Sequence, residues 1–295
     1  MLEPCGCRTI QPLFTHQHHI LSSLGALLIL LAPSCTLAAV RAEAHRPALT
    51  VLPVGDGYQV AGPTFSLNLS RSGAITSLAC QGGLVFDSAY LEVRDKTWHV
   101  KLSPKPEQVK SVPPYGDGDN EKFQYYVHIN DAATGIRLDV NELVVVKSRG
   151  EIDVILKVVP QGEFEAQRIA WNTEFPASRY VGTACAWQKG KGPQNTLQFP
   201  RDQAPDPHMA AGFDWMRLNC GDGPVDLRFS AVDAQNKPML ANTSLEDLRW
   251  WNQPSFWIVD AASYPPENGD ATQPMKIEPG ENCTLRVSMI MHCGE

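Results

Sequence analysis

Apolar and polar residues alternate along most of the chain beyond residue 50, which is the periodicity of β-strands rather than helices. The clearest alternation runs from Phe123 to Val159, where three successive segments each place their apolar side chains on one face. Turn sequences at 131–135 and 148–150 separate these segments. Three antiparallel strands with one apolar face need a second layer, and in a chain of this pattern that layer is another sheet. The sequence therefore predicts a large antiparallel β-sandwich.

The same alternation predicts further strands at Glu165–Asn172, Val225–Ala231 and Cys283–His292. A single short helix is expected around Ser244–Trp250. Its N-cap would be Ser244, a residue type that accepts hydrogen bonds from the first free amides of a helix.

Two segments are rich in glycine, proline and charge, and we expect them to be long loops: Thr183–Phe213 and Ala261–Pro274. Long loops in a compact domain often carry binding residues. No internal repeat or low-complexity linker interrupts the chain after residue 50. The all-β part, residues 45–295, is therefore predicted to be one domain.

Residues 1–44 have a different character. Arg8 precedes the apolar run Leu24–Ala32, and Ala42-Glu43-Ala44 supplies a small-x-small cleavage sequence. This is the layout of a secretory signal peptide, and the run is shorter than the roughly 20 residues of a membrane span. We expect a secreted or periplasmic domain with no membrane span after cleavage. An uncleaved N-terminal anchor and a lipoprotein attached at Cys35 remain alternatives.

The formal net charge is −7, and no basic run is present. This balance argues against nucleic acid or an anionic membrane as the main partner. Five cysteines follow the leader without any C-x-x-C spacing, so neither a zinc site nor a cofactor is predicted: Cys80, Cys185, Cys220, Cys283 and Cys293. Export permits disulfides, but the sequence does not determine their pairing or the oligomeric state.

Two short segments carry a resemblance to a known family. The stretch Phe65–Leu78 reads F-S-L-N-L-S-R-S-G-A-I-T-S-L, and Ile277–Glu281 reads I-E-P-G-E before the last strand. Both resemble the ends of galactose-mutarotase-like β-supersandwich domains. The resemblance implies a supersandwich fold and carbohydrate as the partner. Active members of that family use a histidine and a carboxylate on the concave face of one sheet, but no catalytic motif aligns here, so the catalytic residues stay unknown.

Candidate carbohydrate-binding residues come from the exposed sides of the predicted elements. Tyr126 and His128 share the polar face of one strand, where a ring and an imidazole suit sugar binding and proton transfer. Trp250 and Trp251 offer indole faces for stacking on a sugar. Arg168 lies on a strand flanked by glutamates. A solvated sheet face and ordinary core packing are the competing interpretations of these five residues.

Three further groups have simpler explanations. His208 lies in an acidic loop with Asp202 and Asp206, in a spacing that matches no metal pattern. Glu163, Glu165 and Glu174 flank the Arg168 strand, and two of these carboxylates could act as an acid–base pair only if the fold brings them together. The acidic segment 117–121 lacks EF-hand spacing and is interpreted as a solvated turn, so no metal site is predicted.

These observations lead to one main hypothesis and two alternatives. The main hypothesis is an exported carbohydrate-binding β-sandwich protein related to sugar-active enzymes. The first alternative is a carbohydrate-active enzyme, an epimerase, glycosidase or lyase, that uses a histidine and a carboxylate. The second is a non-catalytic envelope interaction protein on an immunoglobulin-like or jelly-roll sandwich.

Overall fold

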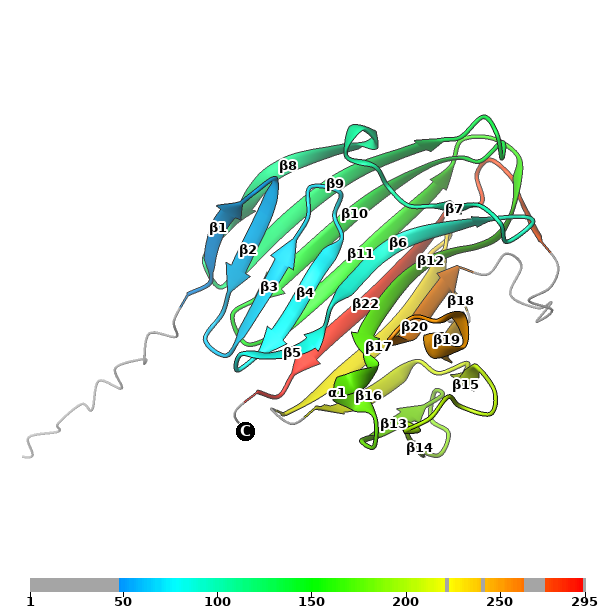
Figure 1. The fold of residues 1–295 in the computed structure, drawn as a ribbon. Helices are drawn as coiled ribbons and strands as arrows, with labels where there is room; N and C mark the ends of the chain where they lie inside the picture. The colour runs from blue at the N-terminus through cyan, green and yellow to red at the C-terminus, as the bar shows by residue number, and fades with distance from the viewer. Residues whose placement is uncertain (1–47, 221–222, 240–241, 263–273, 294–295) are drawn as a thin grey trace, which may run out of the picture. The chain divides into compact units, whose positions relative to one another are not determined.

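A computed structural model describes residues 48–220, 223–239, 242–262 and 274–293. Two antiparallel sheets, of 12 and 10 strands, pack as a sandwich, which confirms the predicted all-β fold. In Figure 1 the strands β3, β4 and β6 lie in front of β9, β10 and β11. The predicted signal peptide and most of the loop expected at 261–274 lie outside the described residues.

The 12-stranded sheet has the order β1-β2-β3-β4-β6-β12-β20-β19-β15, and β5, β7 and β21 pair at its side. Its strands are β1 (Thr50–Val54), β2 (Gly57–Ala61), β3 (Phe65–Leu69), β4 (Ile75–Cys80), β5 (Gly83–Phe86), β6 (Ser88–Asp95), β7 (Lys101–Leu102), β12 (Phe164–Pro176), β15 (His208–Ala211), β19 (Asn242–Asp247), β20 (Ser255–Ala262) and β21 (Met275–Ile277).

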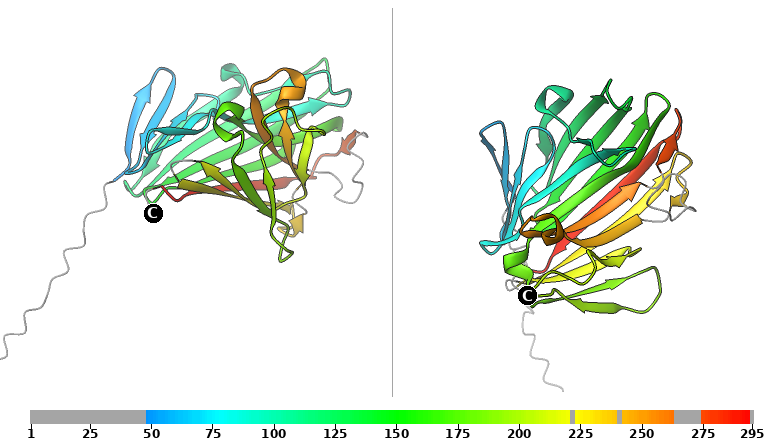
Figure 2. Two further views of the ribbon diagram at one scale, coloured as in Figure 1. Left: turned by 60° about the horizontal axis from the view of Figure 1, so that its bottom comes forward. Right: turned by 45° about the vertical axis from the view of Figure 1, so that its right-hand side comes forward.

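The 10-stranded sheet has the order β14-β13-β16-β17-β22-β11-β10-β9-β8, with β18 paired to β17. Its strands are β8 (Val109–Gly116), β9 (Asn120–Asn130), β10 (Arg137–Lys147), β11 (Glu151–Pro160), β13 (Ala184–Gln188), β14 (Asn195–Gln198), β16 (Trp215–Cys220), β17 (Gly223–Asp233), β18 (Pro238–Met239) and β22 (Cys283–Met291). Short helical turns are η1 (Pro106–Gln108), α1 (Ala177–Tyr180) and η2 (Leu248–Trp251). Figure 2 shows the β1–β2 and β13–β14 hairpins at opposite ends of the sandwich.

The core lies between the two sheets and follows the predicted alternation. In β9 every second side chain is buried, from Phe123 to Ile129, and β10 and β11 repeat the pattern. β10 pairs with β9 along its whole length and with β11 from Leu138 to Lys147. Because the pleat sends alternate side chains to opposite faces, this register leaves the remaining positions of each strand for the outer surface.

The helix expected at Ser244–Trp250 is wrong. Ser244 lies in β19, which pairs with β20 along its whole length, and only η2 follows. Thr243, Leu245 and Asp247 are buried at alternate positions, a strand pattern that outweighs the capping signal of Ser244. The true N-cap of η2 is Asp247, whose side chain accepts from the amide of Arg249.

The long loop expected at Thr183–Phe213 is also wrong in part. It contains three short strands, β13, β14 and β15, which lie at or near the edges of the two sheets. Each is only four or five residues long. Strands this short show too few alternations to be distinguished from a loop by sequence pattern.

Candidate functional site

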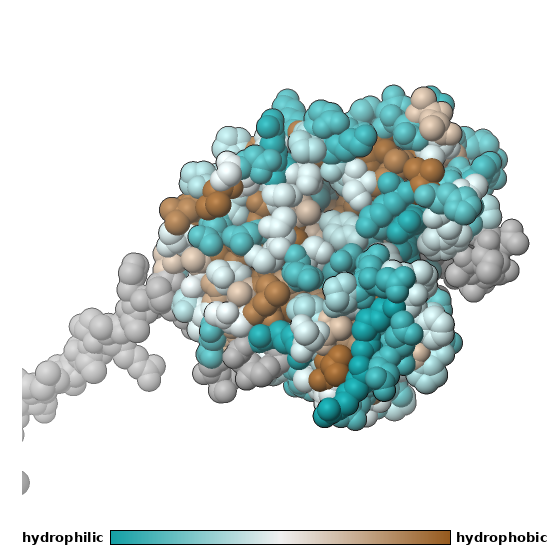
Figure 3. All heavy atoms as spheres, viewed as in Figure 1, coloured by the Kyte–Doolittle hydropathy of each residue, from teal (hydrophilic) through white to brown (hydrophobic). Residues whose placement is uncertain are grey.

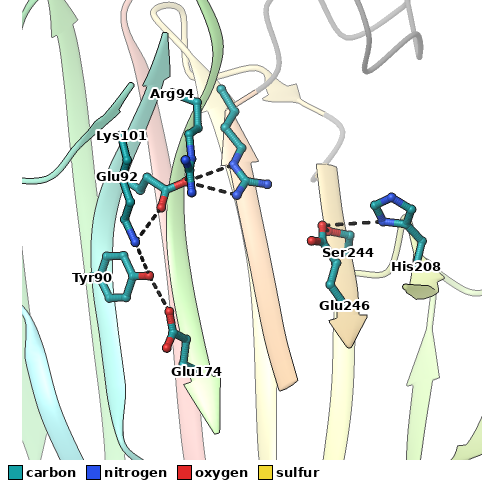
Figure 4. Close-up of polar contacts among 9 residues, drawn as sticks. Tyr90, Glu92, Arg94, Lys101, Glu174, His208, Ser244 and Glu246 are labelled. Carbon is teal, nitrogen blue, oxygen red and sulfur yellow. Dashed lines mark hydrogen bonds and ion pairs between the residues drawn. The ribbon is translucent and has the colours of Figure 1, made fainter. Parts of the chain in front are cut away.

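The outer face of the 12-stranded sheet carries a group of charged side chains. On paired strands β6 and β12, Tyr90 lies opposite Asn172, and Arg94 lies opposite Arg168. Residues in register share one face of a sheet, so their side chains gather on the side away from the core. Figure 4 labels five members of this group, Tyr90, Glu92, Arg94, Lys101 and Glu174. Together with Arg168, which contacts Glu92, we call them the sheet-face cluster.

Glu92 is the centre of the cluster and is completely buried. Its Oε1 accepts from Arg94 Nε at 2.7 Å and from Arg168 Nη2 at 3.1 Å, and its Oε2 lies 3.1 Å from Lys101 Nζ. Burial alone would raise the pKa of Glu92, but these three cations hold that pKa below its ordinary value. The residue is therefore an ionised anchor that fixes three cations on the face of the sheet.

Tyr90 connects this anchor to a second carboxylate. Lys101 Nζ donates to the Tyr90 hydroxyl at 2.8 Å and lies 4.4 Å from the centre of the ring. The hydroxyl in turn donates to Glu174 Oε1 at 2.5 Å. Burial, the hydrogen bond to Glu174 and its charge raise the pKa of Tyr90 above its ordinary range. Tyr90 therefore stays protonated and holds Glu174 in place.

Arg168 makes cation–π contacts with two tryptophans. Its guanidinium lies 4.6 Å from the ring centre of Trp257 and 5.2 Å from that of Trp98. Trp98 is 40% exposed and adopts a φ of +65°, a conformation that is uncommon for a bulky residue. Strain of this kind often accompanies a binding site.

Two polar groups beside the cluster lack a hydrogen-bond partner among the described residues. They are both amide atoms of Asn172 and the indole Nε1 of Trp257, all buried. Asn172 lies between Tyr90 of β6 and Val259 of β20 in the sheet register. Buried polar groups are normally paired, so these unpaired atoms are an unusual feature of the sheet beside the cluster.

A histidine and a carboxylate meet on the same face. His208 Nδ1 lies 3.7 Å from Glu246 Oε1, and Ser244 Oγ donates to that oxygen at 2.8 Å (Figure 4). Glu246 is buried, whereas His208 is exposed. Trp257 lies opposite both Glu246 and Glu174 in register, so the His208–Glu246 pair and the sheet-face cluster are neighbours on one surface.

An open pocket of about 360 Å³ adjoins the cluster. It is lined by Ser72, Ala74, Tyr90, Leu91, Lys101, Ser103 and Pro104. Lys101 and Tyr90 therefore belong to both the pocket and the cluster. Viewed from this side, hydrophilic and hydrophobic side chains alternate over the sheet, and hydrophobic ones gather over the edge strand β1, where Leu52 and Val54 are exposed (Figure 3).

The five residues predicted from sequence do not meet in one site. Arg168 belongs to the sheet-face cluster. Tyr126 and His128 lie on β9 of the other sheet, where the His128 side chain is 63% exposed and its Nδ1 lies 2.5 Å from Asp139 Oδ1. Trp250 and Trp251 are exposed on η2, and Trp250 Nε1 donates to the carbonyl of Ala204 at 2.9 Å.

Sequence reasoning missed Tyr90, Glu92 and Lys101, and it named Glu174 only as one of several glutamates. A signal was present in the segment Ser88–Asp95, where a tyrosine, a glutamate and an arginine alternate with alanine, leucine and valine. Opposite charges two residues apart on one strand face indicate a built polar network rather than simple solvation.

In the described part of the chain, no three histidine, cysteine or acidic side chains are arranged to hold a metal ion. Asp117, which was considered with the acidic segment 117–121, accepts hydrogen bonds from the amides of Asn120 at 2.7 Å and Asp119 at 3.1 Å. Within the same described ranges, no helix has the length and apolarity to cross a membrane.

Residues 59–224, more than half of the chain, match the family model described as D-apionate lactonase, N-terminal domain. The chain belongs to this family. The matched range of this chain, residues 59–224, contains every member of the sheet-face cluster and His208. Glu246 and Trp257 follow it in the sequence. No curated protein matches the chain.

Solved structures show the fold of this family member. Galactose 1-epimerase from Lactobacillus acidophilus is 8% identical, with a TM-score of 0.53 over 84% of this chain and 98% of that one. The Slr1438 protein of Synechocystis is 10% identical, with a TM-score of 0.50 over 85% and 97% of the two chains. The expected resemblance to galactose-mutarotase-like domains is thereby confirmed at the level of the fold.

Proposed function

We propose that this protein is an exported carbohydrate-active enzyme that binds a cyclic sugar or sugar lactone on the outer face of its 12-stranded sheet. The observation that carries the proposal is the sheet-face cluster, with a buried ionised glutamate, a tyrosine–carboxylate pair and a histidine–carboxylate pair beside it. The family supports the class, because a lactonase hydrolyses a cyclic ester.

Opening such a ring needs a base and an acid on one surface. In the proposed step Glu174 takes a proton from water, the water oxygen adds to the lactone carbonyl, and the ring C–O bond breaks. The protonated His208, which Glu246 supports, then gives its proton to the departing ring oxygen. Glu174 is on β12 and His208 is on β15, with β20 and β19 between them, so their backbones lie about 14 Å apart and a sugar ring fits between the two side chains.

Trp257 supports this arrangement because it lies between Glu174 and Glu246 in the sheet register. Its indole is buried under the Arg168 guanidinium, so it supports the surface between the two carboxylates from below.

The test is a time-resolved NMR assay of aldonolactone hydrolysis and of aldose mutarotation by the purified protein. We expect Glu174→Gln and His208→Ala each to lower the catalysed rate by about a hundredfold or more, the usual contribution of a general acid or base. His128→Ala, on the other sheet, is the matched control and should keep the rate. Turnover that survives both substitutions would contradict the assignment.

A binding module without turnover is the second candidate. The family is defined as an N-terminal domain, so in the enzyme that gives it its name the chemistry can reside in another part of the chain. This candidate predicts sugar binding without ring opening. Calorimetry on the same variants separates the two functions, since Glu174→Gln would then change affinity while no rate is present to change.

A further inference from the structure

The sheet-face cluster holds more positive charge than its carboxylates require. Arg94, Arg168 and Lys101 all contact Glu92, and the nearby Glu174 is the second acid of the group. Three cations against two carboxylates leave one positive charge, because Tyr90 is neutral. This excess stands out on a chain whose formal net charge is −7.

Arg94 and Lys101 are the two more exposed cations of the cluster. Each has N–H donors that make no hydrogen bond to another described residue. Arg94 contacts Glu92 through Nε alone, and its side chain is 21% exposed, so the two terminal nitrogens are free to bind. Lys101 is 39% exposed, and its ammonium donates a hydrogen bond to the Tyr90 hydroxyl and forms an ion pair with Glu92. The terminal nitrogens of Arg94 and the remaining N–H of Lys101 are donors suited to an oxyanion.

The open pocket beside Lys101 leaves room for the ligand, and Arg94, which does not line the pocket, lies opposite Lys101 in the strand register. Lys101 lines the pocket, together with the hydroxyl-bearing residues Ser72 and Ser103. Glu92, the nearest acid to Lys101, is completely buried behind its three cations and so presents no carboxylate surface to a ligand. The pocket is large enough, at about 360 Å³, for part of a small sugar.

We propose that the ligand of this face is an anionic sugar whose carboxylate or phosphate binds Arg94 and Lys101, while its hydroxyls reach the rest of the cluster. The inference rests on the proposed function and narrows it from sugars in general to acidic sugars. Glu92 then has a defined role as a positioning residue: its ion pairs hold the cations at fixed places, which lowers the entropic cost of binding.

The first experiment compares ligands on the wild-type protein by calorimetry at low and high salt. The probes are gluconate, glucose and a hexose phosphate. We expect an anionic probe to bind about tenfold or more tightly than glucose, and its advantage to shrink as salt screens the exposed charges. A preference for gluconate identifies a carboxylate, a preference for the phosphate identifies a phosphoryl group, and either result supports an anionic ligand.

The second experiment uses substitutions that remove charge and keep length. Lys101→Met should weaken the anionic probe by about tenfold and glucose by much less. Arg94→Met provides an independent variant if Lys101→Met does not fold. Lys157→Met, an exposed lysine on β11 of the other sheet, is the control and should change neither affinity.

Two outcomes would overturn the inference. One is equal binding of gluconate, the phosphate and glucose, with no effect of salt. The other is an equal loss of affinity for charged and neutral probes in Lys101→Met. In both cases the proposed function survives if glucose binding or ring opening still depends on Glu174 and His208. If the folded wild-type protein bound none of the three probes, both proposals would be rejected.

Discussion

Glu142 is a carboxyl group that the fold buries without a cation. It points into the core from β10, lies opposite Tyr125 of β9, and its carboxylate would be 2.7 Å from a Cβ placed on Gly73. Burial raises its pKa from 4.5 to about 8. Gly73 has a φ of +90°, so this turn combines a left-handed conformation with a close approach that only glycine allows.

This carboxyl makes stability depend on pH. The unfolded chain releases the Glu142 proton near 4.5, whereas the folded chain keeps it until about 8, so stability is full below 4.5 and is lost as the pH rises toward 8. The loss amounts to about 1.4 kcal/mol per pH unit between the two values. We expect Glu142→Gln to remove this slope and to raise the free energy of unfolding at neutral pH, measured by urea denaturation across that pH range.

Asp260 supplies the control for that measurement. It is also fully buried, and burial raises its pKa from 3.8 to about 8. Asp260→Asn should therefore remove a separate part of the slope, and the double variant should remove both parts. A wild-type unfolding free energy that stays flat between acidic and mildly alkaline pH would show that neither carboxyl is buried in the way described.

At the scale of elements, the turn after β19 organises the segment that leads to His208. The Asp247 carboxylate accepts from the amide of Ala204 at 2.8 Å and from Arg249 Nε at 2.8 Å. Arg249 in turn donates to the carbonyls of Pro200, Arg201 and Asp202. Burial alone would raise the pKa of Asp247, but the hydrogen bonds and charge of Arg249 and the Ala204 amide hold it below its ordinary value.

We expect Asp247→Ala to loosen residues 200–204 while the two sheets stay folded. Breaking a buried, hydrogen-bonded ion pair costs about 3–5 kcal/mol, and here part of that cost falls on one connection. Hydrogen exchange should show faster exchange at the Ala204 amide than in β10. Asp139→Ala, which removes an exposed carboxylate on the other sheet, is the control and should leave the Ala204 amide unchanged.

Strands with many alternations could be predicted from the sequence, and those with few could not. β9, β10 and β11 each have ten or more residues and one apolar face. The alternation therefore predicted both the strands and the face that each one buries. β13, β14 and β15 are too short for that signal. At β19 the local capping preference of Ser244 pointed to a helix, but pairing with β20 decided the conformation.

At the scale of the whole molecule, the site depends on strand order, which the sequence does not reveal. Glu92 and Arg168 are 76 residues apart, and Tyr90 and Glu174 are 84 apart. They meet only because β6 pairs with β12 in one particular register. Tyr126 and His128 form a polar strand face whose sequence pattern is as clear as that of β6, but it belongs to the other sheet. The sequence alone could not show which of the two faces carries the site.

The disulfide between Cys80 and Cys293 connects the two layers. Cys80 ends β4 of the 12-stranded sheet, and Cys293 follows β22 of the 10-stranded sheet, 213 residues later in the chain. A bond that closes so long a loop restricts the unfolded chain, which should stabilise the protein by about 2–5 kcal/mol.

We expect dithiothreitol to lower the melting temperature of the wild type and to leave that of the double variant Cys80→Ala/Cys293→Ala unchanged. Cys185, a buried free thiol, is the internal control, since Cys185→Ala should keep the response to reductant. Equal melting temperatures with and without reductant, with mass spectrometry confirming reduction, would mean that sheet packing alone holds the layers together. A clear difference would instead support export to an oxidising compartment, because cytosolic reductants would keep this bond open.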